Sequence, residues 1–240
     1  MDYKKIINQY EESKYLISMV SVSKLVELGC KLEFSSKTRI LDLCCGYGGM
    51  LKIWNEAFSI TGTGVDRCEE FIDIGKSRLQ KSGNIGVTLI ADDVLKYFDE
   101  TKYDIVICTE PLGDINDTLT LMRKFIKPGG KLIFGRLYTK VPSPPKELID
   151  FDGELCTLDE IYSIIREQDY YLTALSTDSS SEWERYIFWS SQRDLDKLRK
   201  NPEDQRSAAW IEKWNYMYLK YRIAHEGWAL FALEKLTSNN

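Results

Sequence analysis

The sequence predicts an α/β fold in which helices cover both faces of a largely parallel sheet. From Ser36 onward, short apolar runs alternate with helical patterns, and this alternation favours right-handed crossovers between parallel strands. The first apolar run enters a glycine-rich turn before a helix, an arrangement that lets the backbone approach a ligand closely. The 240 residues, 43% of them hydrophobic, suit one α/β domain with an insertion.

The strands of this sheet are expected where short apolar runs are bounded by polar or turn residues. In chain order they are Arg39–Cys44, Ile60–Val65, Val87–Ala91, Tyr103–Cys108, Lys131–Tyr138, Tyr171–Ser176 and Trp228–Lys235. Helices are expected at Met50–Phe58, Glu69–Lys81, Thr118–Ile126, Leu158–Glu167, Glu182–Lys200 and Pro202–His225, with Tyr3–Leu32 mostly helical as well.

Two segments carry turn and loop signals. Lys127-Pro128-Gly129-Gly130 is a stop signal that should end the helix before the fifth strand. The segment Thr139–Asp152, which contains three prolines, is expected to form a loop over the strand ends.

The last quarter of the chain is rich in aromatic residues and holds five of the six tryptophans. Along the second long helix, apolar and aromatic residues recur at steps of three and four, which predicts one continuous stripe. The stripe consists of Ile211, Trp214, Tyr218, Tyr221 and His225. It favours packing against the sheet edge, and a ligand cage is the alternative.

Charge and composition exclude several classes of protein. A net charge of −5 argues against nucleic-acid binding, which depends on neutralising phosphates. The absence of a long apolar run or a secretion signal predicts a cytoplasmic protein with no membrane partner. The six cysteines form no C-x-x-C pair, and His225 is the only histidine, so no metal site is expected. The oligomeric state stays open, with a homodimer as one alternative.

The stretch Ile40–Gly49, ILDLCCGYGG, is the most informative part of the sequence. Gly46 and Gly48 lie between a strand and a helix, where backbone N–H groups can face a ligand. A dinucleotide fingerprint would have a third glycine where Leu51 stands, which disfavours pyrophosphate. Asp42, inside the turn, fits a ligand with an ammonium group better than one with phosphates.

Further carboxylates close the next two strands. Asp66 ends the second strand, where a carboxylate can accept both hydroxyls of a ribose. Asp92 and Asp93 end the third strand, level with a purine lying across the sheet, and Asp93 is the preferred candidate. The structural alternatives are that Asp42 only caps the turn and that Asp66 caps the following helix.

These motifs, in this order, resemble a class I S-adenosylmethionine (SAM)-dependent methyltransferase over roughly residues 35–140. LDLCCGYGG matches the family's hydrophobic-Asp-x-Gly-x-Gly-x-Gly motif, with Cys44 where the first glycine usually stands, and KPGGKLIF matches the turn before its fifth strand. The resemblance implies SAM as cofactor and S-adenosylhomocysteine (SAH) as product. It also implies a three-layer αβα sandwich with a Rossmann-like, seven-stranded sheet.

The resemblance assigns the cofactor to one set of positions. The implied cofactor-binding residues are Asp42, Cys44, Gly46, Gly48, Asp66, Arg67, Asp93, Val94 and Cys108. Among them, Asp42 with the glycine backbone would hold the methionyl end, Asp66 the ribose, and Asp93 with the Val94 backbone the adenine.

The C-terminal part resembles a bacterial group of small-molecule-type methyltransferases. The matching motifs are Trp183-x-x-Tyr186, Asn201-Pro202-x-Asp204 and Gly227-Trp228-x-x-Phe231. In that group the last two strands pair antiparallel, so residues 177–226 would be a helical insertion. The sequence departs from the group at Glu110-Pro111 and Arg136-Leu137, so a relative's substrate does not transfer. The resulting expectation is one domain: N-terminal helices (1–34), core (35–176), insertion (177–226), and last strand and tail (227–240).

Together these features predict transfer of a methyl group from SAM to a small-molecule acceptor by in-line displacement. The helical insertion and the N-terminal helices would form a lid over the site. Glu110 is the first candidate for a general base, His225 the second, and Tyr138 is expected to line the acceptor pocket. The structural alternatives are a solvated loop charge for Glu110, a helix C-terminal partner for His225 and a packing role for Tyr138.

Three other functions stay open at this point. The first is a methyltransferase acting on nucleic acid or protein, and the second is a SAM-binding module without catalysis. The third is a nicotinamide-dependent oxidoreductase, which the missing third glycine disfavours.

Overall fold

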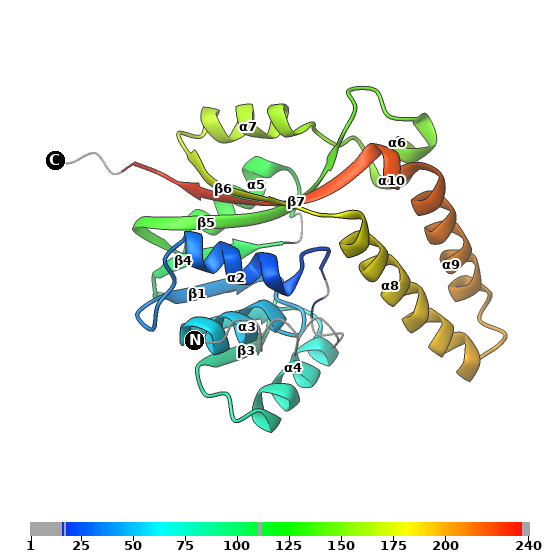
Figure 1. The fold of residues 1–240 in the computed structure, drawn as a ribbon. Helices are drawn as coiled ribbons and strands as arrows, with labels where there is room; N and C mark the ends of the chain where they lie inside the picture. The colour runs from blue at the N-terminus through cyan, green and yellow to red at the C-terminus, as the bar shows by residue number, and fades with distance from the viewer. Residues whose placement is uncertain (1–15, 17, 110–111, 237–240) are drawn as a thin grey trace.

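The computed structural model describes residues 16, 18–109 and 112–236, and its centre is a seven-stranded sheet (Figure 1). The strands are β1 (Arg39–Leu43), β2 (Thr61–Asp66), β3 (Val87–Ala91), β4 (Tyr103–Cys108), β5 (Ile126–Thr139), β6 (Tyr171–Thr177) and β7 (Glu226–Glu234). Their order is β3-β2-β1-β4-β5-β7-β6, and β7 runs in the direction opposite to the other six strands. The predicted fold class is confirmed.

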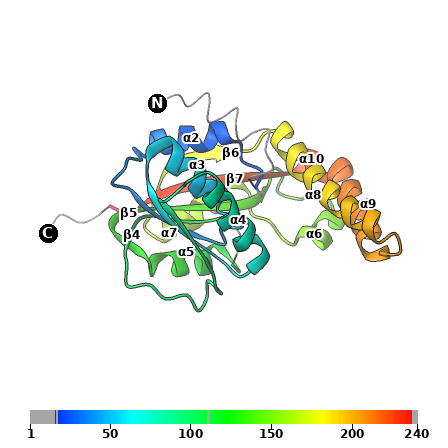
Figure 2. The same cartoon turned by 90° about the horizontal axis from the view of Figure 1, so that it is seen from below.

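Helices cover both faces of the sheet. They are α2 (Val22–Lys31), α3 (Gly49–Phe58), α4 (Glu69–Lys81), α5 (Ile115–Arg123), α6 (Lys146–Asp152), α7 (Leu158–Glu167), α8 (Ser180–Lys200), α9 (Gln205–Met217), a π-helix (Tyr218–Arg222) and α10 (Ile223–His225). Figure 2 shows α2 and α3 on one side of the sheet and α5 on the other. Side chains alternate accordingly along β1, where Ile40 packs into the α2–α3 core and Leu41 into the α5–α7 core. Because both faces of β1 are covered, Ile40–Leu43 is apolar on both faces, with Asp42 as the one exception.

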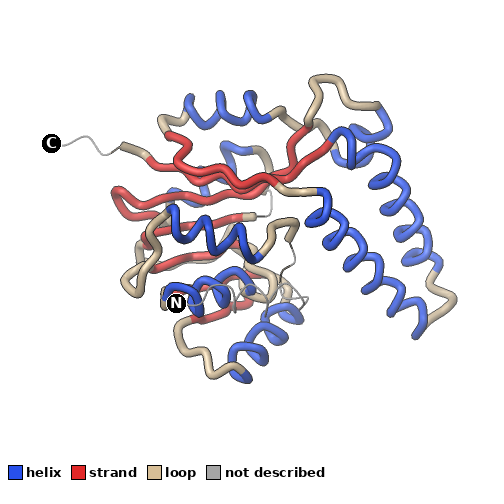
Figure 3. The backbone as a smooth tube through the Cα atoms, in the orientation of Figure 1, coloured by secondary structure: helices blue, strands red, loops and turns tan. Residues whose placement is uncertain are grey.

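Helices α8 and α9 form an antiparallel arm that projects beyond the sheet (Figures 1 and 3). We call residues Ser180–Met217 the arm. It is inserted between β6 and β7, which pair with each other. Glu182 fixes its start to α2, because this buried carboxylate accepts the Ser21 N–H at 2.8 Å and pairs with Lys24.

Several predicted boundaries were wrong. The helix expected at Thr118–Ile126 runs from Ile115 to Arg123, because the Asp114 side chain caps it by accepting the Asp117 N–H at 2.8 Å. The stop signal Lys127–Gly130 lies inside β5 and forms an irregularity in its pairing with β4. Tyr103 pairs with Ile126, whereas Ile105, two residues later, pairs with Lys131.

Two further errors concern the segment after β5 and the second helix of the arm. The expected loop Thr139–Asp152 contains a short helix, α6, which begins after Pro145. The expected helix Pro202–His225 begins at Gln205, capped by Asp204, and widens into a π-helix at Tyr218–Arg222. The first part of the predicted N-terminal helical segment lies outside the described residues, and its end forms the helix α2. None of the helices in the described ranges is long and apolar enough to cross a membrane.

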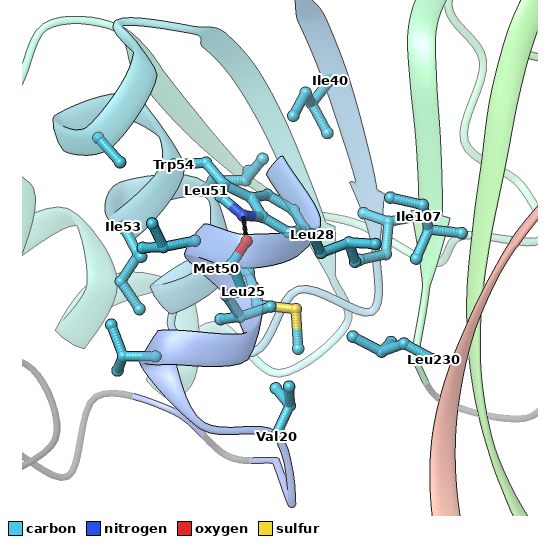
Figure 4. Close-up of a cluster of buried hydrophobic side chains, with 14 of the residues drawn as sticks. Val20, Leu25, Leu28, Ile40, Met50, Leu51, Ile53, Trp54, Ile107 and Leu230 are labelled. Carbon is cyan, nitrogen blue, oxygen red and sulfur yellow. Dashed lines mark hydrogen bonds between the residues drawn. The ribbon is translucent and has the colours of Figure 1, made fainter. Parts of the chain in front are cut away.

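The core beneath α2 and α3 is organised around Trp54, whose side chain is fully buried. Its indole N–H donates to the Leu25 carbonyl at 2.8 Å, which joins α3 to α2 (Figure 4). Phe34 packs against the ring edge-on, with centroids 5.3 Å apart. The glycine-rich turn precedes α3 directly, so this core fixes the helix that supports the turn.

Replacing Trp54 with phenylalanine is expected to lower the free energy of unfolding by about 1–2 kcal/mol, because it removes the hydrogen bond and leaves a small cavity. Chemical denaturation followed by circular dichroism measures the change. Trp210→Phe is the matched control, since that ring is 44% exposed and its replacement should have little effect. Equal stabilities of the two variants would contradict the prediction.

Candidate active site

The glycine-rich turn Cys44–Gly48 adopts a left-handed backbone at three positions. Cys44, Gly46 and Gly48 have φ angles of 64°, 55° and 69°. At Gly48 an added Cβ would lie 2.6 Å from Leu89 Cδ2, so glycine is required there. Cys44 occupies its left-handed conformation without being glycine, which costs on the order of 1 kcal/mol and persists only where the surroundings impose it.

Asp66 holds this turn in place from the end of β2. One carboxylate oxygen accepts the Gly46 N–H at 2.8 Å, and the other accepts the Cys68 N–H at 2.9 Å, just before α4. The same side chain therefore fixes both the turn and the start of the next helix. A carboxylate offers about four lone-pair positions, so capacity remains for ligand hydroxyls.

Asp42 lies beneath the turn and is almost completely buried, with 2% of its surface exposed. Its Oδ1 atom has no hydrogen-bond partner among the described residues. Burial, and next the charge of Asp66, raise the pKa of the Asp42 carboxyl well above its ordinary value. A buried, unpaired carboxylate is costly, and a positively charged ligand group would lower that cost.

A cavity of about 750 Å³ opens above the turn. Seven of the predicted cofactor residues line it: Asp42, Cys44, Gly46, Asp66, Arg67, Asp93 and Val94. The two others do not, because Gly48 caps α3 and Cys108 is fully buried within the sheet core. At the end of β3, Asp93 lines the cavity whereas Asp92 accepts the Asp93 N–H at 2.7 Å.

The three predicted catalytic residues have different outcomes. Glu110 lies outside the described residues. Tyr138 is buried on β5, where its ring packs over Gly227 of β7, and it does not line the cavity. Burial and the charge of Asp178 raise the pKa of its hydroxyl. His225 ends α10 and also lies outside the cavity wall. The geometry thus favours the packing alternative for Tyr138 and gives His225 no access to the cavity.

The opposite end of the cavity joins two tryptophans noted in the sequence to three charged residues that the sequence did not single out. Arg222, of which only 3% is exposed, donates from Nε to Glu226 and from Nη2 to Asp152, both at 2.8 Å. Its guanidinium lies over the rings of Trp214 and Trp183, at 4.6 and 5.1 Å from their centroids. We call these five residues the Arg222 cluster. All except Glu226 line the cavity.

Several polar atoms of this end lack partners. Within the described part of the chain, no hydrogen bond is made by Arg222 Nη1 or by the indole N–H of Trp183 or Trp214. Each unpaired buried donor costs about 1–3 kcal/mol, and native proteins seldom leave such groups unpaired. These donors are therefore the groups at this end of the cavity whose hydrogen bonds the described residues do not supply.

Both carboxyls of the cluster hold their protons more strongly than usual. Burial raises the pKa of Glu226 to about 7 against the pull of Arg222, and the neighbouring charge of Asp152 adds to the rise. Burial likewise raises the pKa of Asp152, with Arg222 again opposing. Carboxyls with perturbed pKa values are typical of functional sites, and of these two Asp152 lines the cavity.

Replacing Glu226 with glutamine is expected to change how stability depends on pH. Because the folded pKa, about 7, exceeds the ordinary 4.5, the stabilising contribution of the protonated carboxyl is complete below 4.5 and is lost as pH rises through 7. Between about pH 5 and about pH 8, wild-type protein should lose on the order of 2 kcal/mol relative to the variant. Melting temperatures of both proteins across this range test it, and parallel pH profiles would contradict it.

The chain is similar in sequence and in fold to several known proteins. A family described as a methyltransferase domain matches residues 34–213. The uncharacterized protein YjhP of Escherichia coli (strain K12) is 28% identical over 247 residues, which cover 97% of this chain and 99% of YjhP.

Two solved structures share the fold over nearly the whole chain, each with a TM-score of 0.87 and 24% identity. One is the SAM-dependent methyltransferase from Geobacter sulfurreducens in complex with SAH, covering 97% of this chain and 98% of that one. The other is the SAM-dependent methyltransferase from Thiobacillus denitrificans in complex with SAH, covering 98% and 99%.

Proposed function

This chain belongs to the methyltransferase-domain family and is a SAM-dependent methyltransferase, and from that premise we propose that it methylates a small molecule held beneath the arm. The observation that carries the proposal is one continuous cavity, which joins the turn at Asp42 to the Arg222 cluster. Its volume of about 750 Å³ lies within the ~300–1,000 Å³ usual for small-ligand sites. An acidic chain also disfavours a nucleic-acid acceptor.

The residues around the turn have the properties that SAM requires. SAM supplies an electrophilic methyl group on a sulfonium centre and carries an ammonium group. Asp42 offers an unpaired, buried oxygen for positive charge, and the left-handed turn keeps side chains away from the ligand. Asp66 is proposed to accept the ribose hydroxyls, and Asp93 with the Val94 backbone to read the adenine. Cys44 and Arg67 complete this wall.

In this mechanism the protein aligns the reactants and excludes water, and it forms no covalent bond with them. In-line displacement at the methyl carbon needs the acceptor atom to be positioned opposite the leaving sulfur. A base is needed only where the acceptor arrives protonated with a high pKa, so the absence of Tyr138 and His225 from the cavity is no obstacle.

The arm is proposed to act as the lid of a single-domain enzyme. Trp183 and Tyr186 of α8 and Trp214 of α9 line the cavity, so the arm supplies part of the acceptor wall. Because its start is fixed to α2 through Glu182, closure would depend on movement of the α8–α9 tip rather than its base.

The test has two parts on the full chain. Titration calorimetry should show binding of both SAM and SAH at micromolar concentrations. Incubation with methyl-labelled SAM and fractionated cell extract should then transfer label to small molecules. Label in acid-precipitable polymers would favour a macromolecular acceptor, and tight SAM binding without any transfer would favour a non-catalytic module. Absence of SAM binding would overturn the proposal.

A further inference from the structure

The arm end of the cavity is rich in hydrogen-bond donors that have no acceptor. Arg222 Nη1 and the indole N–H groups of Trp183 and Trp214 are buried and unpaired among the described residues. All three residues line the same cavity. On the acceptor side, Asp152 Oδ2 accepts no N–H group of the described residues, but the Asp152 and Glu226 carboxyls share a side-chain hydrogen bond. A ligand group that completes this end must therefore mainly accept hydrogen bonds.

The aromatic residues here do not form a free cage for a cationic ligand. The guanidinium of Arg222 already lies over the rings of both Trp183 and Trp214. These ring faces interact with a cation of the chain itself. A second cation at this position would be repelled by Arg222.

The two carboxyls fix the orientation of Arg222 and leave one side of it for a ligand. Glu226 accepts from Nε and Asp152 from Nη2, so the guanidinium plane is held while Nη1 stays unpaired. The two carboxyls also share a side-chain hydrogen bond, so they hold each other as well as the guanidinium. The unpaired Nη1 is thus the side of Arg222 that is left for a ligand.

From this arrangement we infer that the methyl acceptor carries an oxyanion, either a carboxylate or a phosphate, which Arg222 binds with the help of the Trp183 and Trp214 indoles. Arg222 is a specificity-determining residue, and Asp152 and Glu226 are positioning residues that act through it. That the bound anion is the methyl acceptor rests on the proposed function, but anion binding at this site can be measured without turnover.

Four small probes of similar size separate charge from shape: benzoate, phenyl phosphate, benzamide and benzylamine. Calorimetry measures their binding to the full chain, both with and without SAH. One of the two anions should bind at least about tenfold more tightly than benzamide, because charge-assisted hydrogen bonds to arginine are stronger than neutral ones. The tighter of the two anions identifies the group as carboxylate or phosphate.

Two variants connect that preference to the named donors. Trp214→Phe keeps an aromatic ring but removes the N–H, and should weaken binding of the preferred anion by about three- to tenfold without affecting benzamide. Arg222→Lys keeps the charge between Asp152 and Glu226 but removes the planar donor, with an expected loss of at least about tenfold. Trp210→Phe on the same helix is the matched control, since Trp210 does not line the cavity.

The outcomes for the anion site and for the proposed function are separable. Absence of SAH binding would overturn the proposed function alone, since the probes are also titrated without SAH. Equal affinities for anions and benzamide, or a preference for benzylamine, would each overturn the anion site. So would the absence of probe binding at about 10 mM, because a fitting ligand of roughly ten non-hydrogen atoms should bind at that level. An anion preference unchanged in both Trp214→Phe and Arg222→Lys would overturn the assignment to Arg222.

Discussion

Replacing Asp66 with alanine is expected to weaken SAM binding by about 100- to 1,000-fold, or about 3–4 kcal/mol. Two effects combine in this variant. The carboxylate is the proposed partner of the ribose hydroxyls, and it also accepts the N–H groups of Gly46 and Cys68 that fix the turn. Without it, the turn loses its link to α4 and the ligand loses its partner. Titration calorimetry with SAM measures the change.

Two further variants separate these effects. Asp66→Asn retains one acceptor oxygen and the side-chain size, so it should bind SAM with an intermediate affinity. Asp73→Ala, on the exposed side of α4, is the control for loss of an acidic residue and should bind as wild type does. Wild-type affinity in Asp66→Ala would contradict both the ribose assignment and the role in fixing the turn.

Replacing Asp42 with asparagine is expected to change cofactor affinity and stability in opposite directions. The variant should bind SAM about 100-fold more weakly, because it removes the buried negative charge proposed to face the methionyl ammonium. The same variant should melt at a higher temperature without ligand, because burial and Asp66 raise the pKa of Asp42. At neutral pH the folded state therefore bears the cost of a group that prefers to be protonated.

The sign of the stability change follows from that direction. A carboxyl with a raised folded pKa stabilises the protein below its ordinary pKa, and this contribution is lost as pH rises. The gain from asparagine should accordingly grow with pH, which differential scanning fluorimetry across pH can follow. A variant that loses both stability and affinity would indicate that Asp42 only caps the turn.

Local patterns in the sequence were sufficient for most of the sheet. The bounds of β3, β4, α4 and α7 are those predicted, because each combines a clear hydrophobic period with unambiguous end signals. Errors occurred where two local signals competed. At Lys127–Gly130 the pairing of β5 with β4 carries the strand through a turn signal, so tertiary contacts outweigh local preference.

The two ends of the site were predictable to very different degrees. The cofactor end is encoded in short motifs at strand ends, and parallel strands bring those ends together. The Arg222 cluster instead brings Asp152 of α6 and Trp183 of α8 to Trp214, Arg222 and Glu226, from which both are distant in sequence. The sequence predicts a loop at Asp152. It places Arg222 next to Tyr221 of the aromatic stripe but not in the stripe itself. The clustered tryptophans were the one sequence signal for this end.

Cys44 shows how a departure from a motif can leave the geometry intact. The sequence has cysteine where the resembling family usually has glycine, yet the residue adopts the left-handed backbone that glycine would provide. The conformation is thus imposed by its surroundings, including the Gly46 N–H bond to Asp66, rather than by the residue itself.

The position of the arm also bears on how this enzyme can diversify. It leaves the sheet after Thr177 and returns in β7, where Thr177 pairs with Ala229. The two attachment points are therefore neighbours on adjacent antiparallel strands, and the whole arm is topologically the connecting loop of one β-hairpin. Lengthening such a loop costs little chain entropy. Its helices can therefore change in length or sequence while the strand order and the cofactor end of the site stay constant. In this way the range of methyl acceptors could change through the arm alone.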